Sequence, residues 1–393
     1  MQRVGALVEP AFLRAVTSWE LAAVPLFLWM GELINRSDLS LRLFRGLTPW
    51  VARLPGGLLH TNVAGCVLFS AVSGSSVATT ATVGQITSAA LSERRYDRRL
   101  AVGSVAAAGA IGIMIPPSLT MIIYGVITET SVARLFAAGL IPGLMLGAFF
   151  ALYIWVRALA NPALAPAEPG EGGWRMRLAR LPDLLPVTFL IVLVLGGIYS
   201  GMATPSEAAA LGVGGTLLVV LASGQARPAL LLSTAMAAAR TTAMLGTAFG
   251  AAAVLSTALG LMHVPQAVAA WISARGLSPL MLILLIGAVY ILLGCVLESV
   301  SMILMTLPIT FPLVMAAGYD PIWFGVFIVL VVEMGLVTPP IGFNLFVMRG
   351  ITGYPIGEIA RGAFPFFLIM VGAAALLIAV PNIALWLPRI LFG

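Results

Sequence analysis

Two Pro-Pro pairs lie inside apolar stretches of this chain, at 112–120 (GIMIPPSLT) and at 335–344 (GLVTPPIGFN). Proline lacks a backbone N–H and its ring clashes with the preceding helical turn, so a helix must break at each pair. In apolar surroundings the carbonyl groups freed by a break need partners, and a bound cation can serve as one. The residues expected to bind ions or substrate are Gly112, Pro116, Pro117 and Ser118 at the first break, and Thr338, Pro339, Pro340, Gly342 and Asn344 at the second.

The second break is the richer of the two in oxygen-bearing side chains. A threonine hydroxyl at Thr338 and an amide at Asn344 stand beside the unwound carbonyls. Such neutral oxygens suit a hard, weakly bound ion such as Na⁺. The first break offers Ser118 and Thr120 instead. The alternative is that both proline pairs merely kink a helix.

Two short polar stretches interrupt other apolar blocks and could meet these breaks. One is Ser73-Gly74-Ser75-Ser76, and the other is Glu298-Ser299. Helix ends that meet at such a point present carbonyls to a cation and amide donors to a carboxylate. Ordinary helix packing by small residues is the competing explanation for the first stretch. Glu298 is a candidate for cation binding or charge compensation, because intramembrane carboxylates are costly and usually functional.

The composition indicates a polytopic membrane protein. Apolar residues make up 60% of the chain, charged residues only 9%, and mean hydropathy is +1.06. The net charge of +6 comes entirely from arginine and reads as a topology signal, so nucleic-acid binding is not expected. No Walker A, GxSxG or HExxH motif occurs, and two cysteines and two histidines are too scattered for a metal centre. We expect neither an enzyme nor a protein with an organic cofactor.

The first half shows a pattern of basic loops that predicts a re-entrant hairpin. The expected units of 1–158 are a span at 19–35, a hairpin at 54–92, a broken helix at 100–128 and a span at 134–158. A basic loop that contains Arg36, Arg42, Arg45 and Arg53 precedes the hairpin, and the basic stretch 92–99 follows it. Both flanks should be cytoplasmic, so the apolar block between them must enter the bilayer and turn back.

A polar segment at 159–183 reads as a cytoplasmic linker to the second half, 184–393. The expected units of that half are spans at 184–201, 207–223 and 229–262, a hairpin at 278–317, a broken helix at 320–350 and a span at 362–388. Intramembrane ionisable groups include Glu333, just before the second break, and Arg240, inside the span 229–262. For Arg240, pairing with a neighbouring carboxylate is favoured over contact with an anionic substrate.

The two halves are related by an internal repeat with a constant offset. Pairs of identical residues 223 positions apart are Tyr96 and Tyr319, Asp97 and Asp320, Gly112 and Gly335, Pro116 and Pro339, Pro117 and Pro340, Gly139 and Gly362, and Pro142 and Pro365. The loop at 94–99 holds four arginines, whereas its counterpart at 318–321 holds none. The reversed charge bias predicts an inverted repeat, the usual plan of secondary transporters.

The spans at 184–223 have no counterparts in the first half under this offset. We therefore expect that one or two helices are missing, either because the gene start has been placed too late or because the protein is shortened.

Several motifs, in order along the chain, carry a resemblance to a known family. They are VPLFLWMGELINR (24–36), LPGGLLHTNV (54–63), VSGSSVATTATVG (72–84), IPPSLTMIIYGVITETSVARLFAAGLIPG (115–143), GIYSGMATPSEAAALGV (197–213) and EMGLVTPPIGFNLFV (333–347). Together they resemble the large membrane subunit of tripartite ATP-independent periplasmic (TRAP) transporters. The resemblance covers nearly the whole chain from about residue 19.

The resemblance implies an all-α inner-membrane importer of the elevator type. Two hairpins and two broken helices would move against a scaffold, and the comparison of motifs implies that the first helix of the family is missing here. Na⁺ would drive uptake of a small organic anion, often a carboxylate, delivered by a periplasmic solute-binding protein, and a small four-helix membrane subunit would brace the large one. By motif, the stretches 73–76, 115–118, 298–299 and 338–342 fall where the ion and substrate sites of the family lie, although Glu298 stands where the family has an aspartate. The candidate Na⁺ ligands are Ser73, Ser76, Gly112, Glu298, Thr338 and Gly342.

Two other readings remain open. A stand-alone ion-coupled transporter of the same architecture would need no binding protein. A channel or non-transporting membrane scaffold is the alternative of a different class, and the short N-terminus is the reason to keep it. It predicts no Na⁺ dependence.

Overall fold

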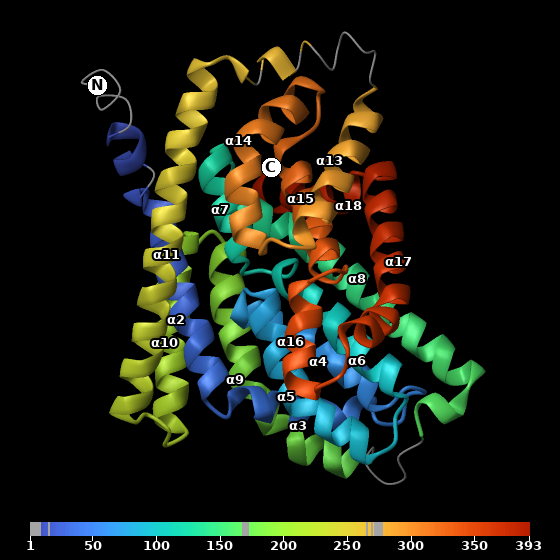
Figure 1. The fold of residues 1–393 in the computed structure, drawn as a ribbon. Helices are drawn as coiled ribbons and strands as arrows, with labels where there is room; N and C mark the ends of the chain where they lie inside the picture. Colours follow the sequence, from blue (N-terminus) through green and yellow to red (C-terminus); the bar gives the residue numbers. More distant parts are fainter. Residues whose placement is uncertain (1–8, 15, 167–172, 265, 269, 271–277) are drawn as a thin grey trace.

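The computed structural model describes residues 9–14, 16–166, 173–264, 266–268, 270 and 278–393 (Figure 1). Every regular element in the described part of the chain is a helix. The first half contains η1 (Trp19–Ala22), α2 (Ala23–Arg36), α3 (Leu39–Val51), α4 (Leu58–Ser73), α5 (Ser76–Glu93), α6 (Arg98–Gly109), η2 (Ala110–Ile113), α7 (Leu119–Thr128), α8 (Val132–Ala160) and η3 (Pro162–Leu164). The second half contains α9 (Trp174–Tyr199), α10 (Pro205–Ala222), α11 (Pro228–Leu261), α13 (Pro279–Gly294), α14 (Ser299–Ala316), α15 (Pro321–Leu336), α16 (Phe343–Thr352), α17 (Ile356–Ala379) and α18 (Asn382–Phe392).

The helices have the lengths of a multi-pass membrane protein. Among the described residues, six are long and apolar enough to cross a bilayer, namely α8, α9, α10, α11, α14 and α17. Others are apolar but short: α4 and α13 have 16 residues each. At 1.5 Å per residue such a helix spans roughly 24 Å, less than the roughly 30 Å hydrocarbon core. Short helices of this kind need neighbours that shield their ends.

The segment predicted as a basic loop after the first span is largely a helix, α3. Its buried apolar residues Leu39, Leu43, Phe44 and Leu47 recur at helical spacing, and the arginines lie between them. The loop prediction was wrong because arginine content was weighed above this periodicity. Packing against α4 and α9 places α3 at the lower edge of Figure 1.

Two further boundaries differ from the expected ones. Helix α9 begins at Trp174, so the latter part of the expected 159–183 linker is helical. The expected single span at 362–388 is two helices, α17 and α18, which meet at Val380 and Pro381. Proline at that point cannot donate to the preceding turn, so the helix direction changes there.

The helices pack in two groups. One comprises α2, α3, α9, α10 and α11, in which α2 packs on α10 and α11, and α3 and α10 pack on α9. Figure 1 shows α2, α10 and α11 side by side at the left of the molecule. The other group contains the two hairpins, α4–α5 and α13–α14, with the interrupted helices α6–α7 and α15–α16. Contacts of α2, α3 and α9 with α4, and of α11 with α14, are among those that join the two groups.

One end of the molecule gathers the basic segments. The guanidinium of Arg42 on α3 lies 3.6 Å from the Asp183 carboxylate on α9. Near it, Arg177 donates to the Pro49 carbonyl at 3.1 Å and lies over the Trp50 ring. Charged and aromatic side chains that meet in this way are typical of a membrane interface.

Candidate functional site

The tip of the first hairpin is docked on the first helix break. Gly74 adopts φ +63° between α4 and α5, a left-handed conformation that glycine reaches at little cost. Its carbonyl accepts a long hydrogen bond, 3.5 Å, from the Leu119 amide at the start of α7. A Cβ on Gly112 would lie 3.1 Å from the Ser75 carbonyl oxygen and 2.8 Å from the Ser76 Cα. The predicted residues of the first half are therefore in direct contact, and the Pro116-Pro117 segment is buried with them.

The tip of the second hairpin is docked on the second break in the same manner. The Cys295 carbonyl accepts hydrogen bonds from the amides of Ile341 (3.2 Å) and Gly342 (3.1 Å). Gly335, at the end of α15, packs against Gly294 at the end of α13, where a Cβ would lie 2.6 Å from the Gly294 Cα. Leu119 and Gly342 are themselves 223 residues apart, so equivalent positions make equivalent backbone contacts to a hairpin tip.

Backbone oxygens converge beside Gly342. This residue has φ +51°, and a Cβ there would lie 2.8 Å from the Thr338 carbonyl oxygen and 2.9 Å from that of Leu336. The same point lies 3.0 Å from Leu345 Cδ1. The Thr338 hydroxyl donates to the Met334 carbonyl at 2.6 Å, which leaves its oxygen free to accept. Carbonyl and hydroxyl oxygens are the ligands that a hard cation uses, so these residues fit Na⁺.

The environments of the two breaks differ. Pro116, Pro117 and Ser118 are all buried, whereas Pro339 and Pro340 are exposed. A break that is open on one side can exchange an ion with its surroundings more readily than an enclosed one.

Several predicted side chains turn out to have local partners. Glu298 is the N-cap of α14: its carboxylate accepts from the amides of Val300 (3.0 Å) and Ser301 (3.3 Å). The Ser299 hydroxyl donates to the same carboxylate at 2.7 Å. Such capping accounts for a carboxylate at a helix N-terminus without any ion.

The serines of the first site are engaged in the same way. Ser75 caps α5 and Ser118 caps α7, each accepting an amide three residues ahead at 3.3 Å. The Ser73 hydroxyl is paired with that of Thr79 at 2.8 Å. Hydroxyl oxygens used in this way keep a lone pair.

One contact joins the two halves directly and was not predicted. The Ser76 hydroxyl, at the first hairpin tip, donates to the Glu333 carboxylate on α15 at 2.8 Å. The Asn344 amide nitrogen, just beyond the second break, donates to Ser76 at 3.0 Å. In the sequence, Glu333 stands out as a charged residue in an apolar stretch. The internal repeat, however, suggests contacts only between each hairpin tip and the helix break of the same half. This contact requires the three-dimensional packing of α5 against α16.

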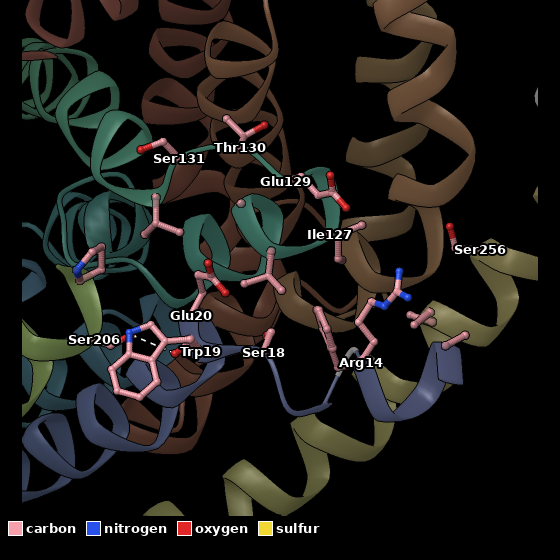
Figure 2. Close-up of a pocket in the computed structure, with 18 of the residues that line it drawn as sticks. Arg14, Ser18, Trp19, Glu20, Ile127, Glu129, Thr130, Ser131, Ser206 and Ser256 are labelled. Atoms are coloured by element: carbon pink, nitrogen blue, oxygen red, sulfur yellow. Dashed lines mark hydrogen bonds between the residues drawn. The ribbon is translucent and has the colours of Figure 1, made fainter. Parts of the chain in front are cut away.

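A cavity of about 870 Å³ lies away from the predicted residues (Figure 2). It is bounded by the segment before α2, the α7–α8 turn, the α9–α10 turn and α11. Figure 2 shows Arg14, Glu20 and Glu129 at its wall, together with hydroxyls such as Ser131 and Ser206. The α9–α10 turn is at the opposite end of α9 from Arg177, so this cavity is remote from the basic end.

Comparison with known proteins decides the family. Residues 2–383 match the family model described as "Tripartite ATP-independent periplasmic transporter, DctM component". The chain belongs to this TRAP transporter family. The C4-dicarboxylate TRAP large permease of Pseudomonas aeruginosa is 36% identical over 372 residues, which covers 94% of this chain and 86% of that protein. As expected from the sequence, the relatives of this chain are transporter permeases and not enzymes.

Relatives within the TRAP family differ in their transported compounds. An ectoine/5-hydroxyectoine large permease of Ruegeria pomeroyi is 32% identical, over 95% of this chain and 87% of that protein. A sialic acid large permease of Vibrio cholerae is 31% identical, over 97% of this chain and 89% of that protein. A solved structure, the YdaH transporter of Alcanivorax borkumensis, has a TM-score of 0.69 at 17% identity over 98% of this chain and 90% of that one, which supports the fold alone.

Proposed function

We propose that this chain is the large transmembrane subunit of a Na⁺-coupled secondary transporter that imports small organic acids across the bacterial inner membrane. A periplasmic binding protein delivers the substrate and a small four-helix membrane subunit completes the transporter. The observation that supports this proposal most is the pair of carbonyl oxygens of Leu336 and Thr338 beside Gly342, called the carbonyl cradle below, in a chain of the TRAP family. That the relatives transport C4-dicarboxylates, ectoine and sialic acid supports an organic solute and leaves its identity open.

An inverted repeat is supported by the way in which corresponding helices pair. Under the 223-residue offset α5, α6 and α8 correspond to α14, α15 and α17, and α7 corresponds to α16. Helix α6 packs on α17 and α15 packs on α8, while α5 packs on α16 and α14 packs on α7. Contacts that occur in such reciprocal pairs are what a two-fold axis between the halves produces.

An elevator mechanism is supported by the separation into two helix groups. The hairpins and interrupted helices hold the candidate ion-binding residues, while α2, α3, α9, α10 and α11 pack mainly on one another. Movement of the first group against the second would carry a bound solute without opening a continuous pore. The basic end is the cytoplasmic side by the positive-inside rule, which puts the 870 Å³ cavity on the side where a binding protein delivers substrate.

Uptake in proteoliposomes tests this function. The chain is reconstituted with its neighbouring small subunit, with or without the cognate binding protein, and with or without an inward Na⁺ gradient. We expect accumulation of labelled organic acid only when both Na⁺ and the binding protein are present. Gradient-driven uptake without the binding protein would identify a stand-alone transporter instead. Absence of uptake under every condition, in liposomes shown to contain folded protein, would favour a scaffold.

Replacing Thr338 by valine should reduce Na⁺-driven uptake about tenfold or more. Valine keeps the shape of threonine and removes only the hydroxyl. A bound ion would then lose one oxygen ligand, a contact worth roughly 1.5–3 kcal/mol. The measurement is the Na⁺ concentration that gives half-maximal uptake.

The matched control for this substitution is Thr216→Val on α10. Thr216 is buried and makes the same bond to the carbonyl four residues earlier, at 2.7 Å, but lies in the other helix group. If the two variants lose the same amount of uptake, the Thr338 hydroxyl contributes only to the stability of its helix and does not bind the ion.

A further inference from the structure

Glu333 is a fully buried carboxylate with one oxygen unused. The residue is 0% exposed on α15. Its Oε2 accepts the hydrogen bond from Ser76, whereas its Oε1 has no hydrogen-bond partner in the described structure. A buried charged oxygen without a partner is among the costliest arrangements in a protein interior. A group that supplies positive charge or a hydrogen bond to Oε1 would relieve this cost.

Asn344, Ser76 and Glu333 form a chain of hydrogen bonds in which each side-chain N–H and O–H group already has an acceptor. The Asn344 Nδ2 donates to the Ala106 carbonyl at 3.2 Å and to the Ser76 Oγ at 3.0 Å. Ser76 in turn donates to Glu333. The Ala106 carbonyl can only accept, so the nitrogen of Asn344 must face it and the amide orientation is fixed. Two acceptors remain, Glu333 Oε1 and Asn344 Oδ1, the latter with only a 3.4 Å contact to Ser76.

In the described part of the chain, no arginine forms an ion pair with Glu333. Arginines there pair with other carboxylates, for example Arg36 with Glu32, Arg42 and Arg180 with Asp183, and Arg98 with Glu358. Glu333 takes part in none of them, and its contacts are a hydroxyl and, through Ser76, an amide. The single negative charge is therefore left for an external cation of one positive charge to balance.

We propose that Glu333 Oε1 and Asn344 Oδ1 bind an alkali cation of the Na⁺ class, which ties the first hairpin tip to the second helix break. This inference rests on the proposed function, because it adds a cation position to a Na⁺-coupled transporter. The position lies between the two halves and is distinct from the carbonyl cradle at Gly342 within the second half. Carboxylate and amide oxygens are ligands that hard cations prefer.

A proton on Glu333 is the competing way to neutralise the site. A protonated Oε1 would become a donor and would need an acceptor, for which Asn344 Oδ1 is the candidate in this group of residues. A metal ion can be bound by both acceptor oxygens at once, whereas a proton bonds to one and is donated to the other.

Thermal unfolding with Na⁺ as the probe tests this proposal without transport. The chain, purified in complex with its small subunit and without substrate, is titrated with NaCl against choline chloride at constant ionic strength. We expect the unfolding midpoint of the parent protein to rise with Na⁺. In Glu333→Gln the half-saturating Na⁺ concentration should increase about tenfold or more, since a charged ligand is lost. Glu333→Asp keeps the charge and should retain most of the response.

The control is Glu32→Gln, which removes a carboxylate paired with Arg36 in a partly exposed position. It should leave the Na⁺ response unchanged. A parent protein without any Na⁺ response would overturn both Na⁺ coupling and this site. A parent response that persists unaltered in Glu333→Gln would refute the Glu333 site while leaving the proposed function intact.

A second variant keeps the proposal testable if Glu333→Gln does not fold. Asn344→Ala removes the amide oxygen and retains the carboxylate, and we expect it to weaken the Na⁺ response about threefold or more, as for one neutral contact. An unchanged response in this variant would count against the site. A midpoint that depends on pH but not on Na⁺ would show that Glu333 holds a proton, which also contradicts the proposal.

Discussion

Alanine in place of Gly103 is expected to force α6 and α17 apart and to destabilise the protein strongly. A Cβ on Gly103 would overlap the backbone carbonyl of Gly362 and lie 2.7 Å from the Ala363 nitrogen. From the other side, a Cβ on Gly362 would overlap the Arg99 carbonyl oxygen and lie 3.3 Å from the Gly103 Cα. Both obstacles are backbone atoms of packed helices, so no side chain can rotate to relieve them.

The expected loss for Gly103→Ala is about 3 kcal/mol or more, at or beyond the upper end of overpacking in protein cores. The net effect should be destabilising. Alanine favours a helix over glycine by only about 1 kcal/mol, which is less than the expected cost of overpacking. The measurement is thermal unfolding of the purified protein in detergent, together with its amount in the membrane fraction.

Gly372→Ala is the matched control for this effect. Gly372 lies on the same helix, α17, and a Cβ there would meet nothing within 4 Å. That variant should be as stable as the parent or slightly more so. Equal stability of the Gly103 and Gly372 variants would mean that α6 and α17 need no close approach.

Gly342→Ala is expected to lower Na⁺-driven uptake about 100-fold while the protein still inserts into the membrane. The new methyl group would occupy the space between the carbonyl oxygens of Leu336 and Thr338, at 2.9 and 2.8 Å. An ion would lose both oxygens, each worth about 1.5–3 kcal/mol when the partner is charged. Alanine at φ +51° adds roughly 1–2 kcal/mol of backbone strain.

Gly353→Ala separates these two effects. Gly353 ends α16 with φ +72°, so alanine suffers comparable strain there, but a Cβ would meet nothing within 4 Å. We expect this variant to transport at near the parent rate, as measured by initial uptake per reconstituted protein. A similar loss in both variants would attribute the Gly342 effect to strain and remove the case for the carbonyl cradle.

The local elements of this fold could be predicted because each has a cause in the sequence. Two Pro-Pro pairs interrupt α6–α7 and α15–α16, since proline cannot continue a helix. Gly74 allows the turn at the first hairpin tip, since its φ of +63° is costly for other residues. The family, too, was indicated by motifs spread over the chain and is shown by the match to residues 2–383.

The remaining features depend on contacts between distant parts of the chain. Glu298 looked like a free charge because its capping partners are backbone amides, which leave no mark in the sequence. Ser76 meets Glu333 only because α5 packs on α16, and an offset repeat cannot show which helices of the two halves face each other. Helix α3 is a different case, because its apolar residues recur at helical spacing in the sequence itself and no distant contact is needed to predict it.

The pairing of α6 with α17 and of Ser76 with Asn344 also bears on biosynthesis. A ribosome delivers the first half to the membrane well before α16 and α17 have been made. Until then the Gly103 surface has no partner and Ser76 lacks the hydrogen bond from Asn344, so both contacts are completed only by α16 and α17. Truncation after α15 is therefore expected to yield a substrate for membrane proteolysis, not a half-size transporter.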